Sequence, residues 1–167
     1  GFGILEVMKA DFRPEHLQEA VRLCDICLHD FEDAEAGGFF MTAKDAAGDL
    51  IARPREWHDG AQPSGNSVML HNLANLAALT GAVRFETAAR RLLSTAAPLL
   101  NQAPTAHSWL ISGAELLFRG VTTVTVAGKR NDKDTLALTG VSGTLYFFMV
   151  RVVNFIITMG PMATAWS

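Results

Sequence analysis

Apolar residues recur at helical spacing along most of the first 119 residues of the chain. Residues 14–31 are predicted to form a helix with one apolar stripe, made of Leu17, Ala20, Val21, Cys24, Cys27, Leu28 and Phe31. Pro14 suits the first turn of this helix, because backbone N–H groups there have no partner within the helix and the one that proline lacks is not needed. Residues 4–9 fit the end of an earlier helix. The chain is therefore expected to begin with consecutive helices.

Three further helices are predicted in the middle of the chain. The first follows the capping residue Ser64 and ends before Gly81. It is apolar on almost every side, so we expect it to be buried. The second, residues 84–100, is amphipathic, and the third, residues 106–119, follows Thr105 as its cap. This alternation of buried and amphipathic helices fits helical hairpins whose inner helices line a core.

Two β-type regions interrupt the helical pattern. Residues 39–42 and 50–53 are short runs separated by a Gly-containing turn, which predicts a small β-hairpin. The loop 54–63 that follows is long for a compact domain, and ordered loops of this length often carry function. Residues 121–127 are rich in Val and Thr and predict one late β-strand.

The C-terminal residues differ from the rest, because residues 135–167 contain a single charged residue, Arg151. A membrane span needs roughly 20 apolar residues, and a central Arg is costly there, so a span is the less favoured interpretation. A buried or poorly ordered segment and a tail created by a reading-frame change both stay open. We therefore divide the chain into a helical part, residues 1–128, and an apolar tail, residues 129–167.

Composition and charge fit a globular protein. Apolar residues make up 49% of the 167 residues and charged residues 19%, enough for a sizeable core. The net charge of −3 and the scattered Lys and Arg residues argue against nucleic acid as a partner, since phosphate backbones require a clustered positive surface. The chain starts Gly-Phe-Gly without an initiator Met or a signal peptide, so an internal start is expected. Its two cysteines give no disulfide framework, and a reducing, cytoplasmic location is expected.

Cys24 and Cys27 form a CxxC pattern, but neither a redox role nor a metal site is predicted. Reactive CxxC pairs open a helix, where the dipole favours the thiolate, whereas these two lie in mid-helix on the apolar stripe. A zinc site would need a second ligand pair at suitable spacing, which the sequence does not provide. Both cysteines are therefore expected to pack in the core, and no cofactor is predicted.

A series of short motifs resembles a known family. The motifs are Gly37-Gly38-Phe39-Phe40, Arg53-Pro54, Asp59-Gly60-Ala61, Pro63-Ser64-Gly65-Asn66-Ser67, Leu79-Thr80-Gly81 and Pro104-Thr105-Ala106. In this order they resemble the C-terminal region of the thioredoxin-domain-containing family similar to spermatogenesis-associated protein 20. The resemblance covers about residues 1–128 and cannot be followed further.

The resemblance implies a two-part parent protein. An N-terminal thioredoxin-like domain would be followed by a six-hairpin (α/α) barrel, which is similar to N-acylglucosamine 2-epimerases and several glycosidases. This chain would then be mainly α and would form part of that barrel, with the β-hairpin as an insertion. The thioredoxin-like domain would be its intramolecular partner. No established substrate comes with the resemblance.

The loop that leads to Ser64 holds the candidate site. His58 and Asp59 are the candidate catalytic residues, because an imidazole and a carboxylate can act as acid or base. The candidate substrate-binding residues, which can hydrogen-bond to sugar hydroxyls or stack on a sugar ring, are Arg53, Trp57, Ser64 and Asn66. A structural interpretation competes with this one, since Asp59 can bind loop amides and Ser64 can cap a helix.

Two functions follow from these observations. The leading hypothesis is a carbohydrate-related barrel protein in which this chain carries one wall of the cleft. The alternative is a non-catalytic scaffold, or a module that presents targets to an upstream thioredoxin-like domain. A buried, hydrogen-bonded Asp59 with no adjoining cleft would favour the alternative.

Overall fold

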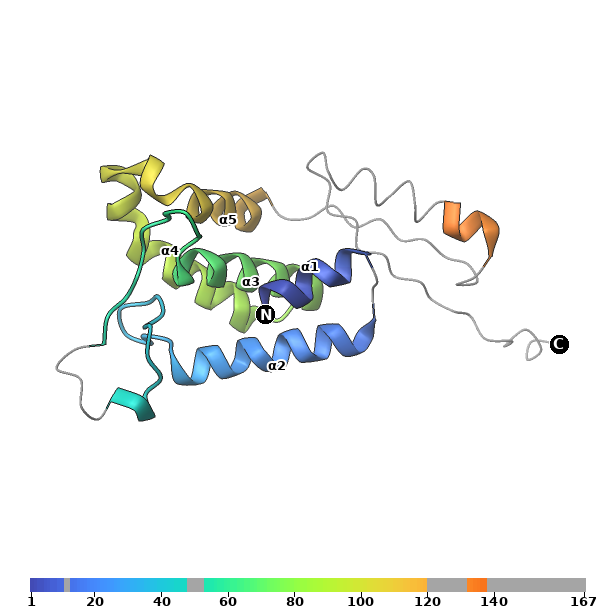
Figure 1. Ribbon diagram of the computed structural model, residues 1–167, viewed down its shortest axis with the longest axis horizontal. Helices are drawn as coiled ribbons and strands as arrows, with labels where there is room; N and C mark the ends of the chain where they lie inside the picture. Colours follow the sequence, from blue (N-terminus) through green and yellow to red (C-terminus); the bar gives the residue numbers. More distant parts are fainter. Residues whose placement is uncertain (11–12, 48–52, 120–131, 138–167) are drawn as a thin grey trace. The chain divides into compact units, whose positions relative to one another are not determined.

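The computed structural model of the chain describes residues 1–10, 13–47, 53–119 and 132–137. Its Cα positions divide into two units, Gly1–Gly120 and Val121–Ser167. The first unit contains α1 (Phe2–Ala10), α2 (Pro14–Asp30), α3 (Gly65–Thr80), α4 (Val83–Gln102) and α5 (Ser108–Arg119), together with the 3₁₀ turns η1 (Asp45–Ala47) and η2 (Pro104–His107). The expectation of a mainly α protein is confirmed (Figure 1).

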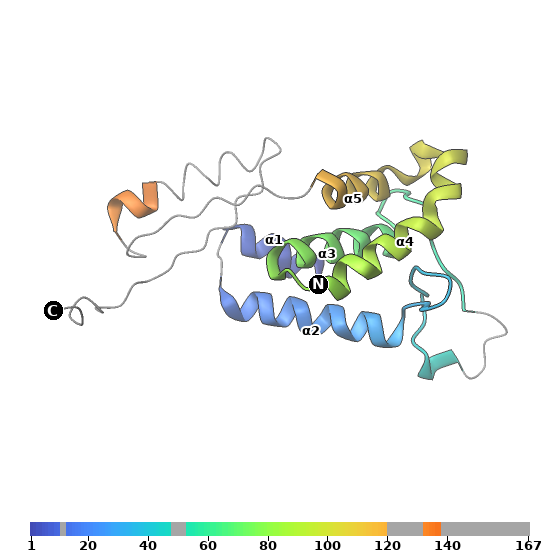
Figure 2. The same ribbon diagram turned by 180° about the vertical axis from the view of Figure 1, so that it is seen from behind.

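Helix α3 lies at the centre of the first unit. It contacts α1, α2, α4 and α5, and both views show it between α2 and α5 (Figures 1 and 2). Its side chains Leu70, Leu73 and Leu76 are completely buried, as expected for a helix that is apolar on almost every side. Consecutive helices are also paired, α1 with α2 and α3 with α4, as helical hairpins require. A place for these hairpins in a six-hairpin barrel stays a prediction.

The ends of α3 follow the local sequence signals. The Ser64 hydroxyl accepts a hydrogen bond from the Ser67 N–H at 3.2 Å, which confirms Ser64 as the cap. Gly81 ends the helix in the left-handed region, with φ of 66°, and its N–H donates to the Ala77 carbonyl. The cap predicted for the last helix was wrong, because Thr105 lies inside η2 and α5 begins at Ser108.

Only the first segment of the predicted β-hairpin lies wholly within the described residues. No strand occurs in the parts of the chain that the structure describes, and Phe39 forms an isolated antiparallel bridge with Glu32. The predicted partner segment lies mostly in residues 48–52, which are outside the described residues, so the hairpin is not confirmed. The predicted strand at 121–127 is also outside them.

Little of the second unit is described. Residues 133–137 form one short helical segment, and the rest of the predicted apolar tail lies outside the described residues. The alternatives for residues 135–167 and the proposed division after residue 128 therefore stay predictions. None of the described helices is both long and apolar enough to cross a membrane.

Candidate functional site

Asn66, in the first turn of α3, fastens the segment around Phe39 to the helix. Its Oδ1 accepts the Phe39 N–H at 2.7 Å, and its Nδ2 donates to the Phe39 carbonyl at 3.0 Å. Nδ2 also donates to the Glu56 carbonyl at 2.8 Å. The side chain is 1% exposed, and both of its amide protons are used inside the protein. Asn66 thus joins two loops to α3 and has no free donor for a sugar hydroxyl.

Gly37 and Gly38 permit this close approach of the loop. Their φ angles are 82° and 83°, a region that favours glycine. A Cβ on Gly38 would lie 2.6 Å from the ring of Trp57, and one on Gly37 would lie 2.6 Å from the Thr95 hydroxyl. Trp57 is therefore half-buried against the Gly38 backbone, and its own carbonyl accepts a 2.8 Å hydrogen bond from Nδ1 of His107.

Asp59 links its loop to the start of α5. One carboxylate oxygen accepts the Ser64 N–H at 2.9 Å, and the other accepts the N–H groups of Trp109 and Leu110 at 2.9 and 3.2 Å. The amides at a helix N-terminus favour a negative charge in this position. Asp59 therefore performs the capping role that the sequence had suggested for Thr105.

These contacts also set the charge of Asp59. Burial acts to raise the pKa of its carboxyl group, but the hydrogen bonds from Ser64, Ser67, Leu110 and Trp109 outweigh burial and hold the pKa below the ordinary value of 3.8. The group is thus an ionised acceptor at neutral pH. A general acid or base works best with a pKa near the operating pH, and these hydrogen bonds move Asp59 in the opposite direction.

The remaining candidate residues lie at different places in the structure and bind different partners. Arg53 lies against the end of α2, where its guanidinium donates to the carbonyls of Asp30 and Thr42 and sits 4.1 Å from the ring centre of Phe40. His58 is exposed, and its ring centre lies 6.4 Å from that of His107. Asp59 and Ser64 are brought into direct contact, whereas Arg53 and Asn66 bind other parts of the backbone.

The chain is similar to part of spermatogenesis-associated protein 20. It is 31% identical to the rat protein over 136 residues and 29% identical to the human protein over the same length, which is 81% of this chain in both cases. The chain spans about 17% of the length of these relatives. No protein-family profile matches it.

This similarity supports the relationship inferred from the motifs between Gly37 and Ala106. It relates the chain to a portion of a much longer protein. The thioredoxin-like domain, the barrel and any action on carbohydrates stay predictions.

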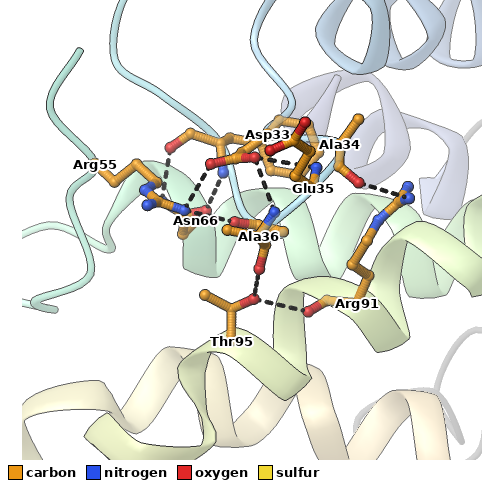
Figure 3. A network of polar contacts seen from close by, with 10 residues as sticks. Asp33, Ala34, Glu35, Ala36, Arg55, Asn66, Arg91 and Thr95 are labelled. Atoms are coloured by element: carbon orange, nitrogen blue, oxygen red, sulfur yellow. Dashed lines mark hydrogen bonds and ion pairs between the residues drawn. The ribbon is translucent and has the colours of Figure 1, made fainter. Parts of the chain in front are cut away.

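Sequence reasoning missed a polar network that holds loop 33–38 (Figure 3). Asp33 accepts the N–H groups of Glu35 and Ala36 and forms an ion pair with Arg55, at 3.1 Å. On the other side of the loop, Arg91 and Thr95 of α4 donate to the carbonyls of Ala34 and Ala36. An Asp that begins a turn is a recognisable local signal. The distant partners of the loop have no such signal, because only tertiary packing brings Arg55 to Asp33, and Arg91 and Thr95 to the loop carbonyls.

Hydrogen bonds also lower the pKa of Asp33. The bond from the Ala36 N–H lowers its pKa most, burial opposes this, and the Glu35 N–H and the Arg55 and Arg53 charges lower it further. Arg55 additionally donates to the Gly37 carbonyl at 2.9 Å, so it stabilises the same loop at two points.

The CxxC cysteines lie within α2, as expected. Cys24 is 3% exposed in the core, and burial, with smaller effects from Cys27 and Asp25, raises its pKa to about 12. Burial also raises the pKa of Cys27, which is only partly covered. Among the described residues, no three His, Cys, Asp or Glu side chains are grouped so that they could hold a metal ion.

Proposed function

We propose that this chain is a non-catalytic helical scaffold within a larger protein similar to spermatogenesis-associated protein 20. The segment 53–67 then organises the helices and loops instead of reacting with a substrate. A target-presenting role for an upstream thioredoxin-like domain belongs to the same proposal, with that domain as the intramolecular partner.

The observation that carries this proposal is the use of Asp59. Both of its carboxylate oxygens accept backbone N–H groups, one from Ser64 and the other from the start of α5. A catalytic carboxylate needs an oxygen within reach of the substrate proton and a suitable pKa. Asp59 is occupied by the fold and has a lowered pKa, which supports a structural role.

The other polar candidates support the same function. Asn66 donates both amide protons to the carbonyls of Phe39 and Glu56, and Arg53 donates from Nε and Nη2 to the carbonyls of Thr42 and Asp30. Ser64 caps α3. Residues that bind sugars need unsatisfied donors and acceptors directed at the ligand.

Carbohydrate binding is the second candidate, and one observation favours it. The imidazole of His58 is exposed next in sequence to the half-buried indole of Trp57. A sugar ring can stack on an indole and form a hydrogen bond with a neighbouring imidazole. In this case His58, and not Asp59, would contact the ligand.

Two variants distinguish these functions, Asp59→Asn and His58→Ala, made both in the 167-residue chain and in the longer protein that contains it. The scaffold function predicts that Asp59→Asn lowers Tm and that His58→Ala leaves Tm unchanged. It also predicts that neutral, amino and acidic sugars give no heat of binding in titration calorimetry with any of these proteins. A sugar that binds the wild type and is lost in His58→Ala at unchanged Tm would overturn the scaffold proposal in favour of carbohydrate binding.

A further inference from the structure

A small apolar pocket lies between the end of α2 and the first turn of α3. Its volume is about 140 Å³. Its walls are formed chiefly by aromatic rings and sulfur-containing side chains, from Cys27, Phe31, Phe39, Phe40, Met41 and Met69. Neither the scaffold role nor the candidate site around Asp59 accounts for this pocket.

The walls of the pocket are held in place by hydrogen bonds. The Phe40 N–H donates to the Phe31 carbonyl at 2.9 Å, and the Met41 N–H donates to the Pro54 carbonyl at 2.9 Å. Asn66 holds both backbone groups of Phe39. A site whose walls are already ordered loses less conformational entropy when it binds a ligand.

The guanidinium of Arg53 fixes one of the rings. It lies 4.1 Å from the centre of the Phe40 ring and is itself bound to the Asp30 and Thr42 carbonyls. Arg53 therefore acts on the pocket through Phe40 and is a positioning residue, not a ligand-binding one.

The lining restricts the chemistry of a ligand. Asn66 is the polar side chain that borders the pocket, and both of its amide protons and its Oδ1 are already hydrogen-bonded. A charged or strongly hydrogen-bonding ligand would lose its water without replacement, at a high cost in free energy. Aromatic rings and methionine sulfur instead make favourable contacts with another ring.

The size of the pocket restricts the ligand further. Its volume of about 140 Å³ is close to that of the enclosed apolar cavity, roughly 150 Å³, that binds benzene in an engineered protein, although this pocket is partly open to solvent. Met41 is 51% exposed, and its unbranched side chain can move aside at the edge of the pocket. We infer that this pocket is a binding site for a small neutral aromatic molecule of about one ring.

Methionine methyl resonances test this inference directly in the 167-residue chain. Met41 and Met69 line the pocket, whereas Met8 is buried in the helical core and does not border it. Benzene added to protein labelled with ¹³C at the methionine methyls should give saturable ring-current shifts at Met41 and Met69 and none at Met8. Benzoate, which has the same ring with a negative charge, should give no shift. Absence of saturation, or equal shifts at Met8, would show that the pocket is not a site.

A pair of adjacent substitutions on α2 provides the matched control. Cys27 lines the pocket, while Ile26 is 39% exposed and does not line it. Filling the pocket with Cys27→Phe should weaken benzene binding by about tenfold or more, whereas Ile26→Phe should leave it unchanged. Equal affinity in the two variants would overturn the assignment. In each variant, a Met8 methyl resonance at its wild-type position serves as the check that the protein is folded.

Alkylation of Cys27 gives a second measurement that needs no substitution. Saturating benzene should slow the reaction of Cys27 with iodoacetamide several-fold, because the ligand covers one side of the thiol. Cys24 lies deeper, at 3% exposure, and its rate should not change with benzene. If the alkylation rate of Cys27 does not change at a benzene concentration that saturates the methyl shifts, benzene binds elsewhere.

Discussion

The side-chain amide of Asn66 binds both backbone groups of Phe39, a residue 27 positions earlier in the chain. An asparagine at the start of α3 thus takes the place that a neighbouring β-strand would occupy beside Phe39. The same amide reaches the Glu56 carbonyl, so a single side chain holds two loops against the helix. The segment 53–67 acquires much of its structure through this contact.

Replacing Asn66 should destabilise the protein strongly. Asn66→Ala removes the partners of the buried Phe39 backbone groups, and each unsatisfied buried group costs about 1–3 kcal/mol. We expect a loss of at least about 2 kcal/mol in the free energy of unfolding, measured by urea denaturation. Asn101→Ala, at an exposed position of α4, is the control and should change stability by less than about 0.5 kcal/mol. Equal effects of the two substitutions would contradict the role of Asn66.

The contribution of Asp59 to stability should depend on pH. Its pKa is lower in the folded chain than the ordinary value of 3.8, so the folded state favours the ionised form. The stabilisation is therefore complete well above pH 4 and is lost as the pH falls through the folded pKa.

Asp59→Asn should consequently lower the urea midpoint at pH 7 and have a smaller effect near pH 3. Asp33 also has a lowered pKa and contributes to acid unfolding of the wild type, so the comparison must be the difference between variant and wild type at each pH. A difference that does not shrink on acidification would show that the charge of Asp59 is not what stabilises α5.

Two glycines with positive φ should respond differently to alanine. Gly81→Ala meets no atom within 4 Å, so it should cost only the left-handed backbone penalty of about 1–2 kcal/mol. Gly38→Ala has the same kind of penalty and also places a Cβ 2.6 Å from the Trp57 ring. We expect Gly38→Ala to be clearly the more destabilising substitution in thermal unfolding, and a smaller effect than that of Gly81→Ala would rule out the close approach to Trp57.

The two cysteines should differ in reactivity. Burial raises the pKa of Cys24 to about 12, so almost no thiolate forms at pH 8, and the side chain is also covered. Cys27 is partly exposed and should be alkylated first, although more slowly than an unfolded-chain thiol because its pKa is also raised. Mass spectrometry after timed treatment with iodoacetamide measures both rates. Faster modification of Cys24 would contradict its position in the core.

The sequence by itself determined the features that depend on near neighbours in the chain. The apolar pattern predicted α2, α3 and α4, and the caps Ser64 and Gly81 follow from hydrogen bonds to residues three or four positions away. Such contacts are fixed by the geometry of a helical turn, so residue type and spacing are sufficient to predict them.

Only the tertiary structure decided the use of the polar side chains in segment 53–67. The sequence suggested Thr105 as the cap of the last helix and loop amides as partners of Asp59, but Asp59 reaches the first turn of α5, 50 residues away, because its loop packs there. Phe39 lies in a β-type run and is bridged to Glu32, yet its own N–H and carbonyl are both hydrogen-bonded to the side chain of Asn66. A carboxylate, an amide or a guanidinium can bind many partners with similar energy, and the packing of distant segments selects among them.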